Sequence, residues 1–114
     1  MATLTGRDTR THTDLATFAV LTDQGRVRLV LAGSIDQLCI AELEEAVSET
    51  VRTGLPVEVD TRHVTFMDSA GIGALRSLAM TSPHGVTFIE PAEVVRFLLH
   101  VTHLDATVEI VRKA

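Results

Sequence analysis

Hydrophobic and polar residues follow two periodicities along the chain, and together these predict alternating strands and helices. Short apolar or alternating runs are typical of β-strands, whereas apolar residues spaced three and four apart favour amphipathic helices. The runs predict strands over residues 18–21, 26–32, 57–60, 86–89 and 107–111. The spacings predict helices over about 38–52 and 69–80, and a third from Pro91 to about residue 101.

Turn-forming residues separate these elements. The turn at 22–25, with Gly25 able to adopt a positive φ, predicts that the first two strands pair antiparallel. Gly33 is expected to end the second strand, and residues 53–56 to stop the first helix. Residues 61–67 lead from the strand at 57–60 towards the second helix. Pro91 is expected to be the first residue of the third helix, a position that suits a fixed φ.

The order of elements predicts the fold class. It is β-β-α-β-α-β-α-β, which implies an α/β fold with a mixed, mostly parallel sheet and crossover helices. The first 13 residues are polar and rich in Thr and Arg, and we expect a disordered tail there. Residues 14–114 are then expected to form one domain.

Composition narrows the function classes. The chain has 114 residues and four Phe but no Trp or Tyr, so its core must be aliphatic and a base-stacking surface is disfavoured. The net charge of −5 and a single Lys, Lys113, disfavour nucleic-acid binding. The lone Cys39 permits no internal disulfide. With no apolar leader and no span-length apolar stretch, we expect a cytoplasmic protein without a membrane segment.

The segment Asp68-Ser69-Ala70-Gly71-Ile72-Gly73 holds the most informative chemistry. Asp68 and Ser69 are both good N-cap residues, and the free N–H groups at a helix start favour an anion. We expect a phosphate on Ser69 to lie where those donors point. It would add roughly two negative charges beside Asp68, which could repel an acidic partner or block a close fit.

The glycines of this segment need an explanation, because each costs about 1 kcal/mol relative to Ala inside a helix. Gly71 and Gly73 could leave space for another backbone to approach Ser69. Alternatively, Asp68-Ser69 only caps the helix and the glycines only allow close packing on the sheet. From the residues alone both interpretations stay open, and capping is the simpler one.

The sequence motifs give little support for a catalytic site or a metal site. A serine hydrolase would need Gly-x-Ser-x-Gly and a partnered histidine, but the first Gly is missing and nothing places His63 beside Ser69. No Gly-rich phosphate-binding loop with Lys is present. His100 and His103 have a chelating spacing, but only Asp105 lies nearby to complete a set. We therefore expect no catalytic residue, no metal and no cofactor.

Two further features are expected to be structural. Cys39 lies among apolar residues at a helix start, which favours a buried thiol over a reactive one. The acidic residues of the first helix are expected to form a solvated face, with a partner-docking role as the alternative. They are Glu42, Glu44, Glu45 and Glu49.

The run from Val59-Asp60 through Val64 to Leu75, with Asp68-Ser69-Ala70-Gly71-Ile72-Gly73 at its centre, closely resembles the signature of the STAS-domain anti-sigma factor antagonists. Gly33-Ser34-Ile35-Asp36 is similar to the Gly-Glu-Leu/Ile-Asp element of that family, and the helix–strand tail at 93–111 fits its usual ending. The resemblance covers roughly residues 14–112.

The resemblance implies a binding protein rather than an enzyme. Its partner would be an anti-sigma factor that is also a serine kinase, released from the sigma factor when the unphosphorylated chain binds it. Ser69 would be the phosphorylated residue, and a serine phosphatase would reset the switch. Contacts to the partner would involve Asp36, Asp68, Ser69, Ala70, Gly71, Ile72 and Gly73.

Two positions depart from the family pattern. Ser34 stands where Glu is common, and Cys39 stands where Thr or Ser is common. Both lie near the expected contact surface, so they bear on the identity of the partner. The alternative is a STAS module without phosphorylation, in a sensory complex or as an accessory subunit of a transporter.

Overall fold

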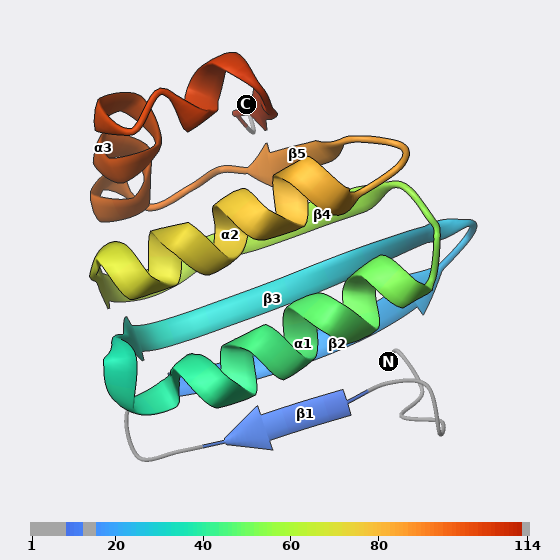
Figure 1. The fold of residues 1–114 in the computed structure, drawn as a ribbon, viewed down its shortest axis with the longest axis horizontal. Helices are drawn as coiled ribbons and strands as arrows, with labels where there is room; N and C mark the ends of the chain where they lie inside the picture. Colours follow the sequence, from blue (N-terminus) through green and yellow to red (C-terminus); the bar gives the residue numbers. More distant parts are fainter. Residues whose placement is uncertain (1–8, 13–15, 113–114) are drawn as a thin grey trace.

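The computed structural model describes residues 9–12 and 16–112 of the chain. Strands and helices alternate along most of it (Figure 1). The strands are β1 (Thr9–His12), β2 (Ala16–Asp23), β3 (Arg26–Ile35), β4 (Val57–Met67), β5 (Val86–Ile89) and β6 (Glu109–Val111). The α-helices are α1 (Ile40–Arg52), α2 (Ser69–Thr81) and α3 (Glu93–Val101), with 3-10 turns η1 (Gln37–Cys39) and η2 (Leu104–Ala106).

The six strands form one sheet in the order β1-β2-β3-β4-β5-β6. The pairs β1–β2 and β2–β3 are antiparallel, whereas β3–β4, β4–β5 and β5–β6 are parallel. A helix makes each connection between parallel neighbours, as parallel pairing requires. The predicted α/β fold with a mixed, mostly parallel sheet is confirmed.

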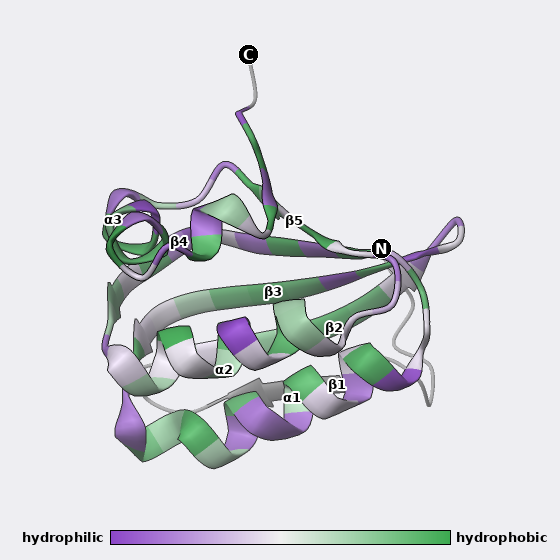
Figure 2. Ribbon diagram, turned by 45° about the horizontal axis from the view of Figure 1, so that its top comes forward, coloured by the Kyte–Doolittle hydropathy of each residue, from purple (hydrophilic) through white to green (hydrophobic). Residues whose placement is uncertain are grey.

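Helices α1 and α2 lie side by side across one face of the sheet, and α3 packs against β4 (Figure 1). Alternate strand residues point towards the helices, so Val27, Leu29 and Leu31 of β3 are fully buried. Phe18 and Phe88 are the largest fully buried side chains of a core that is otherwise aliphatic. Figure 2 shows hydrophobic and hydrophilic segments alternating along α1, as expected for a helix with one buried side.

Charged residues alternate with the core residues of β3 and β4, so they point to the sheet face away from the helices. Glu58 accepts hydrogen bonds from Arg26 (2.6 Å) and Arg28 (2.9 Å). Asp60 is paired with Arg62 at 2.8 Å, and Arg62 in turn lies 3.6 Å from Glu90. These contacts link β3, β4 and the residue after β5.

The arginines set the protonation of both strand carboxylates. Burial acts to raise the pKa of Asp60, but hydrogen bonds from the side chain and backbone of Arg62 outweigh it and hold the pKa below its usual range. At Glu58, burial likewise acts to raise the pKa, but hydrogen bonds from Arg28 and Arg26 outweigh it and the pKa is lowered. Both carboxylates therefore stabilise the folded state when they are ionised.

Several predicted boundaries need correction. Thr9–His12 form β1 inside the predicted tail, while residues 1–8 and 13 lie outside the described residues. Gly33 (φ 90) does not end its strand, because it lies at a register irregularity after which β3 continues to Ile35. Strand β4 extends to Met67 because its pairing with β3 continues to that residue, although its pairing with β5 ends at Asp60.

The third helix and the last strand are also shorter than predicted. Pro91 is not the first residue of α3, because Ala92 is the N-cap and the helix begins at Glu93. The last strand begins at Glu109 rather than residue 107, because the 3-10 turn η2 ends just before it. No helix of the described residues is both long enough and apolar enough to cross a membrane.

Candidate functional site at the start of helix α2

Two neighbouring parallel strands end together and bring the predicted site residues to one edge of the sheet. Ile35 of β3 is in register with Met67 of β4, and the backbone N–H of Asp68 donates to the Ile35 carbonyl at 3.2 Å. Asp36 and Asp68 are the residues that directly follow these two strands. The site is thus built at the carboxyl ends of parallel strands, where α/β proteins commonly place their binding residues.

Asp68 is the N-cap of α2. One of its carboxylate oxygens accepts hydrogen bonds from the backbone N–H groups of Ala70 (3.0 Å) and Gly71 (3.1 Å). We expected those donors to point at a phosphate on Ser69, but in the unphosphorylated chain the Asp68 carboxylate already accepts from both. A phosphate on Ser69 would find these donors taken and a carboxylate beside it.

Ser69 is the first residue of α2, and its side chain is exposed. Its hydroxyl makes no hydrogen bond with any described residue, so capping of α2 rests on Asp68 alone. The interpretation in which Ser69 serves as a cap is therefore not supported by its contacts. The hydroxyl is free to react or to meet another molecule.

The glycines of the site differ from each other. A β-carbon on Gly71 would lie 2.7 Å from Cγ of Met67 and 3.1 Å from Cγ2 of Ile35, so Gly71 allows α2 to pack closely on β3 and β4. A β-carbon on Gly73 would meet no atom within 4 Å, and Gly73 is exposed. Only Gly73 leaves open space of the kind that we expected for both.

The remaining predicted contact residues also differ in how accessible they are to a partner. Ile72 is buried in the core at 6% exposure and cannot meet a partner directly, whereas Ala70 is half-buried. Asp36 is half-buried and caps the 3-10 turn η1, because its carboxylate accepts from the Leu38 N–H at 3.0 Å. The accessible part of the predicted set is therefore Asp36, Asp68, Ser69, Ala70 and Gly73.

Sequence reasoning missed two exposed apolar side chains beside this site. Leu38, two residues after Asp36, is 86% exposed, and Phe66, two residues before Asp68, is 48% exposed. Exposure of large apolar side chains next to a candidate site marks a protein-binding surface more often than an isolated exposed leucine does. Leu38 directly precedes the apolar Cys39 and Ile40, so the local sequence pattern does not reveal its exposure.

Cys39 is buried at 3% exposure, as predicted. Its thiol donates to the carbonyl oxygen of Asp36 at 3.3 Å, and burial raises the pKa of this thiol. Ser34, the other departure from the family pattern, is half-buried and in register with Phe66. Cys39 therefore supports the η1 turn from beneath and is poorly suited to nucleophilic chemistry.

The histidines do not join the site. His63 is exposed on β4, and His100 lies 3.2 Å from Asp105, which it meets through Nδ1. His103 has a left-handed backbone (φ 61) just before η2. Across residues 9–12 and 16–112, no three potential metal ligands are grouped closely enough to hold an ion.

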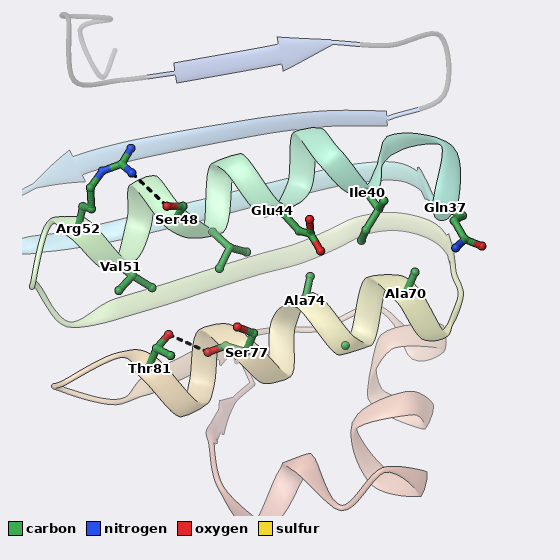
Figure 3. Close-up of a pocket in the computed structure, with 12 residues that line it drawn as sticks. Gln37, Ile40, Glu44, Ser48, Val51, Arg52, Ala70, Ala74, Ser77 and Thr81 are labelled. Carbon is green, nitrogen blue, oxygen red and sulfur yellow. Dashed lines mark hydrogen bonds between the residues drawn. The ribbon is translucent and has the colours of Figure 1, made fainter.

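A groove of about 750 Å³ runs between α1 and α2 from the site towards the helix C-termini (Figure 3). Small residues spaced three and four apart line its α2 side, and this spacing is the signal that sequence reasoning did not use. They are Ala70, Gly73, Ala74, Ser77 and Thr81. The α1 side combines Ile40, Val47 and Val51 with the polar Gln37, Glu44, Ser48 and Arg52.

Solved structures share this fold. An anti-sigma factor antagonist from Mycobacterium paratuberculosis matches with a TM-score of 0.78 and 23% identity, over 88% of each chain. The Bacillus cell fate determinant SpoIIAA matches in its phosphorylated form with a TM-score of 0.67 and 16% identity, over 85% of this chain and 91% of that one. Its unphosphorylated form, an anti-sigma factor antagonist, matches with a TM-score of 0.66 and 16% identity, over 85% of this chain and 89% of that one.

Sequence comparison gives a separate result. No curated protein sequence matches the chain. A family model described as "Mlab, STAS domain" matches residues 18–112, which include every strand from β3 to β6 and the whole candidate site. The match confirms the STAS-domain part of the resemblance seen in the sequence, and the chain belongs to the STAS domain family.

Proposed function

We propose that this chain is a cytoplasmic anti-sigma factor antagonist, a binding protein rather than an enzyme. In this proposal it binds an anti-sigma factor that is also a serine kinase, and thereby releases the sigma factor. Phosphorylation of Ser69 ends the binding, and a serine phosphatase restores it. The observation that carries the proposal is the free, exposed Ser69 hydroxyl at the start of α2 in a fold shared with anti-sigma factor antagonists.

The surroundings of Ser69 suit a contact that a phosphate would abolish. The accessible residues combine apolar area from Leu38 with small side chains at Ala70 and Gly73, which let a partner approach closely. Burial of such area is the main favourable term in protein association. The site needs no cofactor or metal for this role.

The electrostatics supports an off-switch. A phosphate carries about −1.5 to −2 charge at pH 7, and here it would join Asp68 in an overall acidic chain. Because Asp68 holds the Ala70 and Gly71 N–H groups, those donors cannot neutralise the phosphate unless the cap breaks. The phosphate would therefore either repel acidic partner groups or rearrange the first turn of α2, and both effects weaken binding.

Incubation with ATP and candidate anti-sigma kinases, followed by phosphopeptide mass spectrometry, tests the proposal. We expect one phosphate on Ser69, absent from Ser69→Ala and retained in the matched variant Ser77→Ala, which changes another exposed serine of α2. Binding of the same kinase should persist for Ser69→Ala and weaken by at least about tenfold for Ser69→Glu. Equal binding by these two variants would contradict the switch.

A second candidate rests on the family model alone, whose description names the STAS domain but no anti-sigma factor. In this candidate the chain is a STAS interaction module without phosphorylation, within a sensory complex or as an accessory subunit of a transporter. Absence of any phosphate after exposure to all candidate kinases, together with stable binding to a transporter subunit, would support it over the first.

A further inference from the structure

The groove between α1 and α2 has a polar ridge along one side. Glu44, Ser48 and Arg52 follow each other at intervals of four residues on α1, and all three are exposed. Figure 3 shows Glu44 pointing towards α2 and Arg52 bending back along α1 to Ser48. Arg52 donates a hydrogen bond to the Ser48 hydroxyl at 3.0 Å, which holds the guanidinium beside the ridge.

The charges of this ridge are complementary to those of an identical ridge. Glu44 lies four residues before Ser48 and Arg52 lies four residues after it. If a two-fold axis passes beside Ser48, the two α1 helices run antiparallel, and Glu44 of each copy faces Arg52 of the other. An interface of this kind is isologous, so each favourable pair occurs twice.

The groove supplies the space that such a contact needs. Rows of residues four apart on two helices interdigitate at a crossing angle of about 50°. In that packing, each α1 would lie in the groove of the other copy, against the small side chains of its α2. Gly73 and Ala74 leave room there, and the partly buried Ile40 and Val51 provide apolar area on the α1 side.

We infer that the α1–α2 groove binds a second copy of this chain, forming an antiparallel, two-fold symmetric dimer held by reciprocal Glu44–Arg52 pairs. This inference goes beyond the proposed function and does not depend on it, because it concerns the free protein. The dimer covers Ala70 and Gly73, which lie beside Ser69, so self-association competes with any partner that uses those residues.

Analytical ultracentrifugation of the full chain, from about 1 µM to about 1 mM, tests the dimer in the concentration range expected of a small interface. The wild-type chain should dimerise reversibly within this range. Glu44→Arg and Arg52→Glu should each raise the dimer dissociation constant at least about tenfold, because each converts two attractive pairs into two repulsive ones. Asp23→Arg and Arg112→Glu, which make the same charge changes outside the groove, should leave it unchanged.

Recombining the two charge changes gives a sharper result. The double variant Glu44→Arg/Arg52→Glu should dimerise again, because it keeps the pairs with their signs exchanged. An equimolar mixture of the two single variants should form heterodimers more tightly than either variant forms homodimers, since both of its cross pairs are attractive. A monomeric wild-type chain up to 1 mM, or a dimer that both single changes leave intact, would overturn the inference and leave the proposed partner binding untouched.

Discussion

Gly71 of α2 and Met67 of β4 are so close that a β-carbon on Gly71 would lie 2.7 Å from Cγ of Met67. This contact lets the first turn of α2 rest directly on the strand that leads into it. The nearby Gly73 has no comparable neighbour, since its β-carbon would meet nothing within 4 Å. The two glycines of one motif thus have different physical roles.

Alanine substitution should separate these roles. Gly71→Ala is expected to lower the free energy of unfolding by about 1–3 kcal/mol, because Met67 and Ile35 must move within a packed core. Gly73→Ala should raise it by about 0.5–1 kcal/mol, because alanine favours the helix and the site is open. Urea denaturation of both variants measures the difference. Equal destabilisation by the two substitutions would show that the space around Gly73 is not open.

The cap at Asp68 predicts a second effect. Asp68→Ala should cost about 1 kcal/mol of stability, because the Ala70 and Gly71 N–H groups lose their acceptor. Asp68→Asn keeps a side-chain oxygen and should retain most of the stability while removing the charge. Ser69→Ala serves as the control and should change stability by less than about 0.5 kcal/mol. A larger loss for Ser69→Ala than for Asp68→Ala would assign the cap to the serine after all.

The strand carboxylate Asp60 predicts the pH dependence of stability. Its pKa is lower in the folded protein than the usual value near 3.9, so its contribution is complete above about pH 5 and is lost as pH falls through the folded pKa. Asp60→Asn should lower stability by about 1–3 kcal/mol at pH 7, because the side chain is only 7% exposed and Arg62 loses its charged partner.

Urea denaturation between pH 7 and pH 3 measures this effect. The wild-type chain should lose stability faster than Asp60→Asn as pH falls, so the two curves should converge at low pH. Asp23→Asn, at the exposed β2–β3 turn, should run parallel to the wild type. Parallel curves for Asp60→Asn and the wild type would mean that Asp60 does not contribute through its ionised form.

The exposure of Leu38 predicts a loss of binding without a loss of stability. Leu38→Lys should weaken binding of the proposed anti-sigma partner about tenfold, because it removes exposed apolar area from the turn that follows β3, at the sheet edge where α2 begins. Stability should change by less than about 0.5 kcal/mol, since the side chain is 86% exposed. Calorimetric titration with the kinase identified by phosphorylation measures the effect. Met80→Lys, at an exposed position near the other end of α2, is the matched control and should bind as the wild type does.

Periodicity predicted most of the fold, because spacing along one chain records which side of an element is buried. The helices at α1 and α2 and the strand β5 lie where the pattern placed them. Strand β1 escaped prediction because its four residues, Thr9–His12, have no apolar alternation and owe their structure to pairing with β2. Boundaries set by neighbouring strands, such as the end of β4, were likewise hidden from the local pattern.

The candidate site was predicted in position but not in detail. The Asp-Ser-x-Gly-x-Gly pattern located the start of α2, because N-cap chemistry is local. Whether Asp68 or Ser69 caps the helix depends on side-chain geometry, and the burial of Gly71 and Ile72 depends on strands distant in the sequence. The α1–α2 groove depends on two helices together, so neither helix alone predicts it.

Strand β1 protects the neighbouring strand from self-association. It pairs along β2, whose eight residues Ala16–Asp23 include the buried Phe18, Ala19 and Val20. An uncovered strand of this composition offers a ladder of unpaired N–H and C=O groups on which other chains can assemble. A shortened version of the protein that starts at residue 14, where the sequence pattern alone would cut, is therefore expected to aggregate. Expression of the domain should keep Thr9–His12.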